Sequence, residues 1–213
     1  VSIVNETAIG MYENVVGKKT GFLLESYDKN YDRYTFFGAQ PEEIITSEKN
    51  SLVITKDDGT KEIRKGNPLE LLKEYYSDFN IIKDNEELSF SGGLVGNLGY
   101  DFVRYAEKLP DNNPDEIGIE TIQLMLMTKF LLVDHVAETL TAIILEKNDT
   151  EKKKRAYELA DELIQKARRT PKEVERKPLI HDGKLVKQSD NLSEYSRKVE
   201  KIKEYIKEGH IFQ

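Results

Sequence analysis

Short apolar runs separated by polar turns fill the first two thirds of the chain. Runs rich in β-branched and aromatic side chains, bounded by Asp, Asn and Gly, are typical of strands. The pattern predicts strands at 21–26, 33–37, 42–47, 51–56, 61–64, 117–127, 130–135 and 139–145. Strands that follow one another directly predict an α+β fold, rich in antiparallel sheet, rather than a doubly wound fold.

Three segments carry apolar residues at helical spacing instead. Asn67 and Pro68 mark the start of the first, with Asn as N-cap and Pro at the first helical position. The second helix is expected over 150–168 and the third over 191–208, where Gly209 ends it. The apolar faces of the three helices are, in order, Leu69, Leu72, Tyr75 and Tyr76; Tyr157, Ala160, Leu163, Ile164 and Ala167; and Leu192, Tyr195, Val199, Ile202 and Ile206.

The segment 169–191 is polar, holds two prolines and lacks periodicity, so it is the predicted linker. Residues 1–168 then form an α+β domain, and 192–213 form the first helix and strand start of a second domain. A domain seldom ends three residues into an apolar strand such as Ile211 to Gln213. We therefore expect the chain to be a fragment.

The segment 91–110, SGGLVGNLGYDFVRYAEKLP, holds four glycines in an apolar run, followed by a polar and aromatic cluster. Glycine weakens a strand, so four together indicate close backbone approach, a bulge or a tight turn. Their spacing does not fit the dinucleotide fingerprint, and Tyr100 and Asp101 after Gly99 do not fit a P-loop. Arg104 lies three residues from Asp101, which predicts a short, charge-paired helix. We expect Tyr100, Asp101 and Arg104 to lock this strand to its helix rather than to bind substrate.

Composition narrows the class of protein. A net charge of -7 argues against nucleic-acid binding, which needs clustered positive charge. The absence of cysteine excludes disulfides and thiolate chemistry, and a cytoplasmic location is predicted. No apolar stretch is long enough to span a bilayer, so no membrane partner is expected. His135, His181 and His210 stand without ligands at metal spacing, so no metal site is predicted in this chain.

The glycine segment resembles the GGxxGYxGYDxVRxxExLP block of anthranilate synthase component I. Further stretches agree in order: 21–26 (GFLLES) and 33–41 (RYTFFGAQP) resemble its LLES and RYSFIGxxP, 115–135 its DxxG...LVxDH, and 193–213 its SxYxxxVxxxKxYIxxGDIFQ. Asn97 and His210 replace the usual Tyr and Asp, and Asp32 stands where Gly is common. The resemblance covers nearly the whole chain.

This resemblance implies a parent enzyme that converts chorismate and ammonia into anthranilate and pyruvate, with Mg²⁺ as cofactor. A glutamine amidotransferase partner, component II, is implied to supply the ammonia. The Mg²⁺ ligands and chorismate-binding residues are expected in a C-terminal half outside this chain, which alone should be inactive. Gln213 stands where water-adding relatives have a lysine base; its neutral amide cannot activate water but can bind an amine nucleophile. The alternative is a strand residue with a satisfied amide, and we assign Gln213 no catalytic role in this chain.

The motif Leu24, Glu25 and Ser26 is implied to line the site where tryptophan binds as feedback inhibitor. The ammonium group of an amino acid needs an acceptor such as Glu25, and an indole needs apolar walls and a partner for its N–H. The structural alternative places Leu24 in the core and the other two residues on a strand edge. The rest of the tryptophan site is expected outside this chain.

Other hypotheses stay open at this point. Aminodeoxychorismate synthase component I shares much of the pattern. A free-standing amino-acid-binding regulatory module is a second possibility, although such a module should close its own sheet. A non-enzymatic interaction domain is a third, and it would leave Glu25 and Ser26 without a ligand.

Overall fold

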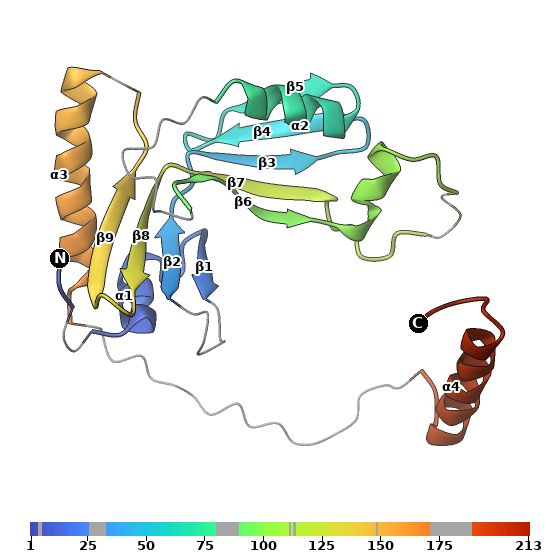
Figure 1. The fold of residues 1–213 in the computed structure, drawn as a ribbon. Coiled ribbons are helices and arrows are strands. Elements are labelled where there is room, and N and C mark those ends of the chain that lie inside the picture. The colour runs from blue at the N-terminus through green and yellow to red at the C-terminus, as the bar shows by residue number, and fades with distance from the viewer. Residues whose placement is uncertain are drawn as a thin grey trace. The chain divides into compact units, whose positions relative to one another are not determined.

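The computed structural model describes residues 1–3, 6–25, 33–79, 90–110, 112, 114–147, 149–170 and 189–213 (Figure 1). The chain divides into two compact units, Val1–Lys172 and Glu173–Gln213. The predicted turn at 27–32 and most of the predicted linker lie outside the described residues.

Two antiparallel sheets form the first unit (Figure 1). The four-stranded sheet has the order β1-β2-β8-β9, with bounds Gly21–Glu25, Tyr34–Ala39, Lys129–Asp134 and Thr139–Ile144. The five-stranded sheet has the order β5-β4-β3-β7-β6, with bounds Lys61–Lys65, Ser51–Lys56, Glu43–Ser47, Ile122–Met127 and Gly93–Leu98. Every strand pairing is antiparallel, which confirms the predicted α+β fold.

The sheets are joined where β7 passes into β8 with only Thr128 between them. Apolar side chains from both sheets pack together there, with Phe22, Phe130 and Leu132 from one sheet and Met127 from the other. The Phe90 ring centroid lies 5.0 Å from that of Phe130 and adds to this contact. Burial of aromatic rings at such distances stabilises the junction.

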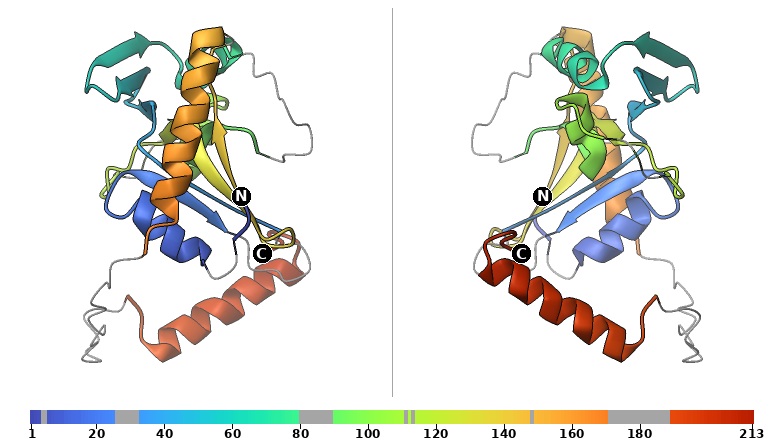
Figure 2. Two further views of the ribbon diagram at one scale, coloured as in Figure 1. Left: turned by 90° about the vertical axis from the view of Figure 1, so that its left-hand side faces the viewer. Right: turned by 90° about the vertical axis from the view of Figure 1, so that its right-hand side faces the viewer.

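Two helices cover the outer face of the four-stranded sheet: α1 (Ala8–Val15) and α3 (Thr150–Ala167) (Figure 2). Phe37, Leu131 and Val133 of the sheet are buried beneath them. The helix α1 was not expected, because eight residues are too few to show helical periodicity clearly. Its one local signal is the N-cap Thr7, whose hydroxyl accepts from the Gly10 amide.

The helix α2 (Pro68–Ser77) packs on the five-stranded sheet. Its N-cap is confirmed, since the Asn67 side chain accepts from the Leu69 amide at 2.9 Å. The expected apolar face is partly wrong: Tyr75 is buried, but Tyr76 is 53% exposed and Leu71 packs in its place.

Two further expectations differ from the structure. In α3, Tyr157 is 66% exposed, because only Leu163, Ile164 and Ala167 near the end of the helix pack on the core. The strand expected over 117–127 is the shorter β7, because the Asp115 carboxylate accepts from the amides of Ile117 and Gly118 and forms a turn instead.

The second unit contains α4 (Leu192–Lys207). Asn191 and Glu194 form a capping box at its start, and Gly209 follows its end with φ +78°. Its predicted apolar face carries exposed Leu192, Tyr195 and Ile202. Residues 211–213 are not part of a strand, since no strand among the described residues pairs with them.

Candidate functional site

Leu24 and Glu25 end β1, the edge strand of the four-stranded sheet. Their partners on β2 are Phe36 and Thr35, respectively. Because neighbouring strand residues point to opposite faces, Leu24 and Glu25 lie on different sides of the sheet. A single ligand can touch both side chains only across the open edge of β1.

The Leu24 face is apolar and aromatic. Leu24 itself is 46% exposed, and its partner Phe36 packs with the Phe90 ring at 5.6 Å between centroids. Tyr34 lies two residues from Phe36 on β2 and its ring lies 6.0 Å away. Such a surface suits a flat apolar group.

The Glu25 face is polar at this end of the sheet. Within the described part of the chain, no hydrogen bond or ion pair to the exposed Glu25 carboxylate is present. Its neighbour Thr35 is fully buried, and the Thr35 hydroxyl shares a 2.8 Å hydrogen bond with Nε2 of His135. A carboxylate in this position can accept from an ammonium group.

An ion pair joins Arg33, just before β2, to Asp134 at the end of β8; Asp134 pairs with Tyr34 and so lies on the Leu24 face. Nε and Nη2 of Arg33 donate to Oδ2 of Asp134 at 3.0 and 2.8 Å. Oδ1 of Asp134 accepts from the amides of Val136 and Ala137, which closes the turn between β8 and β9. The hydrogen bond from Arg33 holds the pKa of the Asp134 carboxyl below its usual value, so Asp134 stays ionised near neutral pH.

The sequence alone does not reveal this cluster. Asp134 and His135 are neighbours in sequence, and neighbouring strand residues point to opposite faces. Each bonds to a residue near the start of β2 instead: Asp134 to Arg33, which directly precedes β2, and His135 to Thr35, at separations of 101 and 100 residues. Only knowledge of the β2–β8 register, which pairs Thr35 with Val133, would have brought them together.

The remaining predicted site residues lie elsewhere. Ser26 and His181 are outside the described residues, so the structure gives neither a position. Gln213 is exposed in the second unit. The grouping of Leu24, Glu25 and Ser26 as a binding site therefore stays a prediction.

The glycine segment forms β6 followed by the 3-10 helix η1 (Tyr100–Tyr105). Nε of Arg104 donates to Asp101 at 2.8 Å, which confirms the predicted charge pair. A side chain at Gly96 would collide with the carbonyl of Gln123 on β7, so close backbone approach explains this glycine. Tyr100 is 97% exposed and does not take part in the lock, contrary to expectation.

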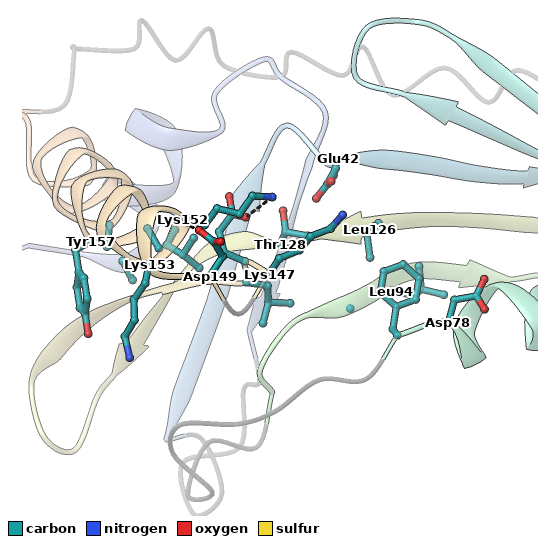
Figure 3. A pocket seen from close by; sticks show the side chains of 18 of the residues that line it. Glu42, Asp78, Leu94, Leu126, Thr128, Lys147, Asp149, Lys152, Lys153 and Tyr157 are labelled. Carbon is teal, nitrogen blue, oxygen red and sulfur yellow. Dashed lines mark hydrogen bonds and ion pairs between the residues drawn. The ribbon is translucent and has the colours of Figure 1, made fainter.

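A cleft of about 720 Å³ lies between the start of α3 and the edges of both sheets. Leu94 and Leu126 line one side, and Lys152, Lys153 and Tyr157 of α3 line the other (Figure 3). Its volume suits a small molecule. Two of its polar side chains have partners within this chain: Lys152 lies 4.0 Å from Glu146, and Asp149 accepts from backbone amides at the start of α3.

A metal ion such as Mg²⁺ would need several oxygen ligands within the described ranges. No cluster of three His, Asp or Glu side chains there can hold a metal ion, so these residues do not fit the Mg²⁺ that the resemblance implies. None of the helices that the structure describes is long and apolar enough to cross a bilayer.

Comparison with known proteins shows the family of this chain. Residues 20–213 match the chorismate binding enzymes. The chain belongs to the chorismate binding enzyme family.

Two curated relatives agree with this assignment. Anthranilate synthase component 1 of Acetivibrio thermocellus is 29% identical over 98% of this chain and 44% of that protein. The same component of Acinetobacter calcoaceticus is 27% identical over 98% of this chain and 43% of that protein. The chain thus spans less than half the length of these curated relatives.

A solved structure supports the fold. The crystal structure of anthranilate synthase component I from Streptococcus pneumoniae TIGR4 superposes with a TM-score of 0.54 at 19% identity. The match covers 96% of this chain and 44% of that one. At this identity the likeness shows the architecture of the family member and nothing about its ligands.

Proposed function

We propose that this chain is the N-terminal part of an anthranilate synthase component I. The full polypeptide would convert chorismate and ammonia into anthranilate and pyruvate, with Mg²⁺ as cofactor, in the cytoplasm. The observation that carries this proposal is the collinear match of 98% of the chain to about 44% of a named component 1. We place the Mg²⁺ ligands and the chorismate-binding groups in the rest of that polypeptide.

The role we assign to this chain is regulation. Tryptophan would bind at the open edge of β1, with its indole against Leu24 and its ammonium group at Glu25. The exposed apolar side chain of Leu24 next to Phe36 supports this arrangement, as does the exposed carboxylate of Glu25, which has no partner among the residues that the structure describes. Because the two side chains face opposite sides, the ligand must wrap around the strand edge. Ser26 would complete the motif.

The assay for this function uses the full-length polypeptide with chorismate, ammonium and Mg²⁺. Anthranilate is identified by its fluorescence and mass, and we expect it as the aromatic product together with pyruvate. Aminodeoxychorismate as the product would instead identify the related aminodeoxychorismate synthase component I. Neither product, with an intact and folded protein, would contradict the proposal.

A second candidate is an amino-acid-binding module without catalysis. It is favoured by one observation: the first unit, Val1–Lys172, packs its own cores on both sheets. Calorimetry separates the two candidates in combination with the assay above. Tryptophan binding without turnover by the full-length protein would favour the module.

A further inference from the structure

The cleft of about 720 Å³ at the start of α3 combines apolar, aromatic and charged side chains (Figure 3). Leu94 and Leu126 of the five-stranded sheet contribute apolar surface to it. Tyr76 of α2 and Tyr157 of α3 also line it, and they are 53% and 66% exposed. Both tyrosines have the helical phase of an apolar face, but the core does not extend beneath them. The cleft therefore offers apolar surface that the described residues leave uncovered.

Charged side chains of both signs line the same cleft. Four carboxylates and three lysines are among its lining residues. In the part of the chain that the structure describes, the exposed side chains of Glu42 and Lys147 have no hydrogen bond or ion pair. A ligand with only negative charge would face the four carboxylates, and a ligand with only positive charge would face the three lysines. A ligand with both charges matches both sets.

Backbone hydrogen bonds place Glu42 and Lys147 at the same part of the cleft. The Glu42 amide donates to the Leu126 carbonyl at 3.0 Å, and the Leu145 amide donates to the Thr128 carbonyl at 2.7 Å. These two carbonyls are two residues apart, and Lys147 follows Leu145 by two residues. Figure 3 shows the Lys147 side chain extending toward Glu42, and no ion pair joins these two described side chains. A carboxylate and an ammonium group held apart in this way can each bind the opposite charge of one ligand.

We propose that this cleft binds a small zwitterion with an apolar body, namely a free amino acid with a large apolar side chain. The ammonium group of the ligand lies at Glu42 and its carboxylate at Lys147. Its apolar body lies on Leu126 and Leu94. The cleft is distinct from the edge of β1, because it is lined by β9, the opposite edge strand of the four-stranded sheet. The inference does not depend on the proposed function.

A packed polypeptide is a poorer occupant of this cleft. The centre of a protein interface is depleted of charged side chains, Lys, Glu and Asp among them. Another segment of the polypeptide, or a second copy of this chain, would bury Glu42 and Lys147 at a high cost unless it brought an opposite charge to each. A free amino acid carries both charges on neighbouring atoms and leaves the rest of the rim in water.

The test measures binding of four probes to the full-length polypeptide by calorimetry or ligand-detected NMR. L-Phenylalanine carries both charges and an apolar body. 3-Phenylpropanoate lacks the ammonium group, 2-phenylethylamine lacks the carboxylate, and glycine lacks the apolar body. We expect L-phenylalanine to bind at least tenfold more tightly than each of the other three. Equal or tighter binding of any of those three would overturn the inference.

Substitutions then locate the site. Glu42→Gln and Lys147→Gln each remove one charge and keep a polar side chain, and each should weaken binding of L-phenylalanine about tenfold. Lys154→Gln and Glu158→Gln are matched controls, because both residues are exposed on α3 and do not line the cleft. Glu25→Gln should also leave this binding unchanged. Unchanged affinity in both cleft variants would overturn the inference.

The remaining outcomes separate this site from the one in the proposed function. Binding that is lost only in Glu25→Gln would place the ligand at the edge of β1 and reject the cleft. Binding by the 213-residue chain but not by the full-length polypeptide would show that another segment covers the cleft, and would reject it too. Binding lost in the cleft variants supports the inference even where the full-length protein makes no anthranilate. No binding of L-phenylalanine at millimolar concentration by the folded, unsubstituted protein would overturn it.

Discussion

The side-chain amide of Asn14 donates to the backbone carbonyl of Ala167 at 2.8 Å, across 153 residues of sequence. It also donates to the Arg169 carbonyl at 2.6 Å, and Lys166 donates to the Val15 carbonyl at 2.9 Å. The last turns of α1 and α3 thus cap each other. This exchange satisfies carbonyls that a helix end leaves without partners.

Asn14→Ala should lower the free energy of unfolding by about 1–2 kcal/mol, because it leaves partly buried carbonyls without donors. Asn14→Asp should destabilise at least as much, since a carboxylate cannot donate. Thermal or urea unfolding measures the change, with the exposed neighbour Glu13→Ala as control. Equal stability of the Asn14 and Glu13 variants would refute the capping role.

Tyr75 anchors α2 to β3. Its hydroxyl donates to Oε2 of Glu43 at 2.6 Å, and the residue is only 5% exposed. We expect Tyr75→Phe to cost about 1 kcal/mol through the lost hydrogen bond. Tyr75→Ala should cost about 3–5 kcal/mol because it also opens a cavity. Denaturant unfolding of both variants checks this order, and a larger cost for Phe than for Ala would contradict it.

The titration of Tyr75 predicts that the folded protein loses stability at alkaline pH. Burial, and after it the hydrogen bond to Glu43, raise the pKa of Tyr75 far above its usual value. A raised pKa means that the stabilisation is complete below the unfolded pKa, about 10, and is lost as pH rises above it. Tyr75→Phe should remove this contribution from the pH profile of stability. If the free energy of unfolding of the variant still falls as steeply with rising alkaline pH, Tyr75 is not the source of this dependence.

The titration of Asp134 predicts that the folded protein loses stability at acid pH. The hydrogen bond from Arg33 lowers its pKa, so its stabilisation is present above the unfolded value of about 3.9 and is lost as pH falls through the folded value. Asp134→Asn removes the charge but keeps an acceptor for the amides of Val136 and Ala137, whereas Asp134→Ala removes both.

We therefore expect Asp134→Asn to cost about 0.5–1 kcal/mol, a modest value because Arg33 is half exposed. Asp134→Ala should cost about 1 kcal/mol more, through the lost turn closure. Unfolding between pH 2 and 7 measures both effects. If the Asn variant keeps the full acid dependence of the original protein, the ion pair is not its source.

Glu25 tests the proposed tryptophan site. In the full-length protein, Glu25→Gln should weaken tryptophan binding about tenfold or more, because a neutral amide no longer compensates an ammonium charge. Turnover without tryptophan should stay the same. Glu74→Gln, an exposed carboxylate on α2, is the matched control. Calorimetry and inhibition curves give the result, and equal affinity in both variants would remove Glu25 from the site.

The elements that sequence predicted well are those with local signals. Ser51–Lys56 is a strand with the predicted bounds, and the N-cap at Asn67 is as expected. The alternation of apolar residues and the capping chemistry act over a few residues, so they can be read without the fold.

The failures have non-local or competing causes. Tyr76 and Tyr157 have the right helical phase, but the core does not extend beneath them. The turn at Asp115 outcompetes a strand at Ile117, although the apolar residues there favour one. The links from Arg33 and Thr35 to the end of β8 depend on strand order, which no local pattern encodes. The opposite orientation of Leu24 and Glu25, by contrast, was available from the strand prediction alone.

The central claim is that this chain is the regulatory part of a chorismate-using enzyme whose catalytic groups lie elsewhere in the polypeptide. The most direct measurement compares anthranilate fluorescence from the purified 213-residue chain and from the full-length polypeptide, each given chorismate, ammonium and Mg²⁺. We predict sustained anthranilate formation by the full-length protein and none by the chain alone. Turnover by the chain alone, or its absence from both, would contradict the account.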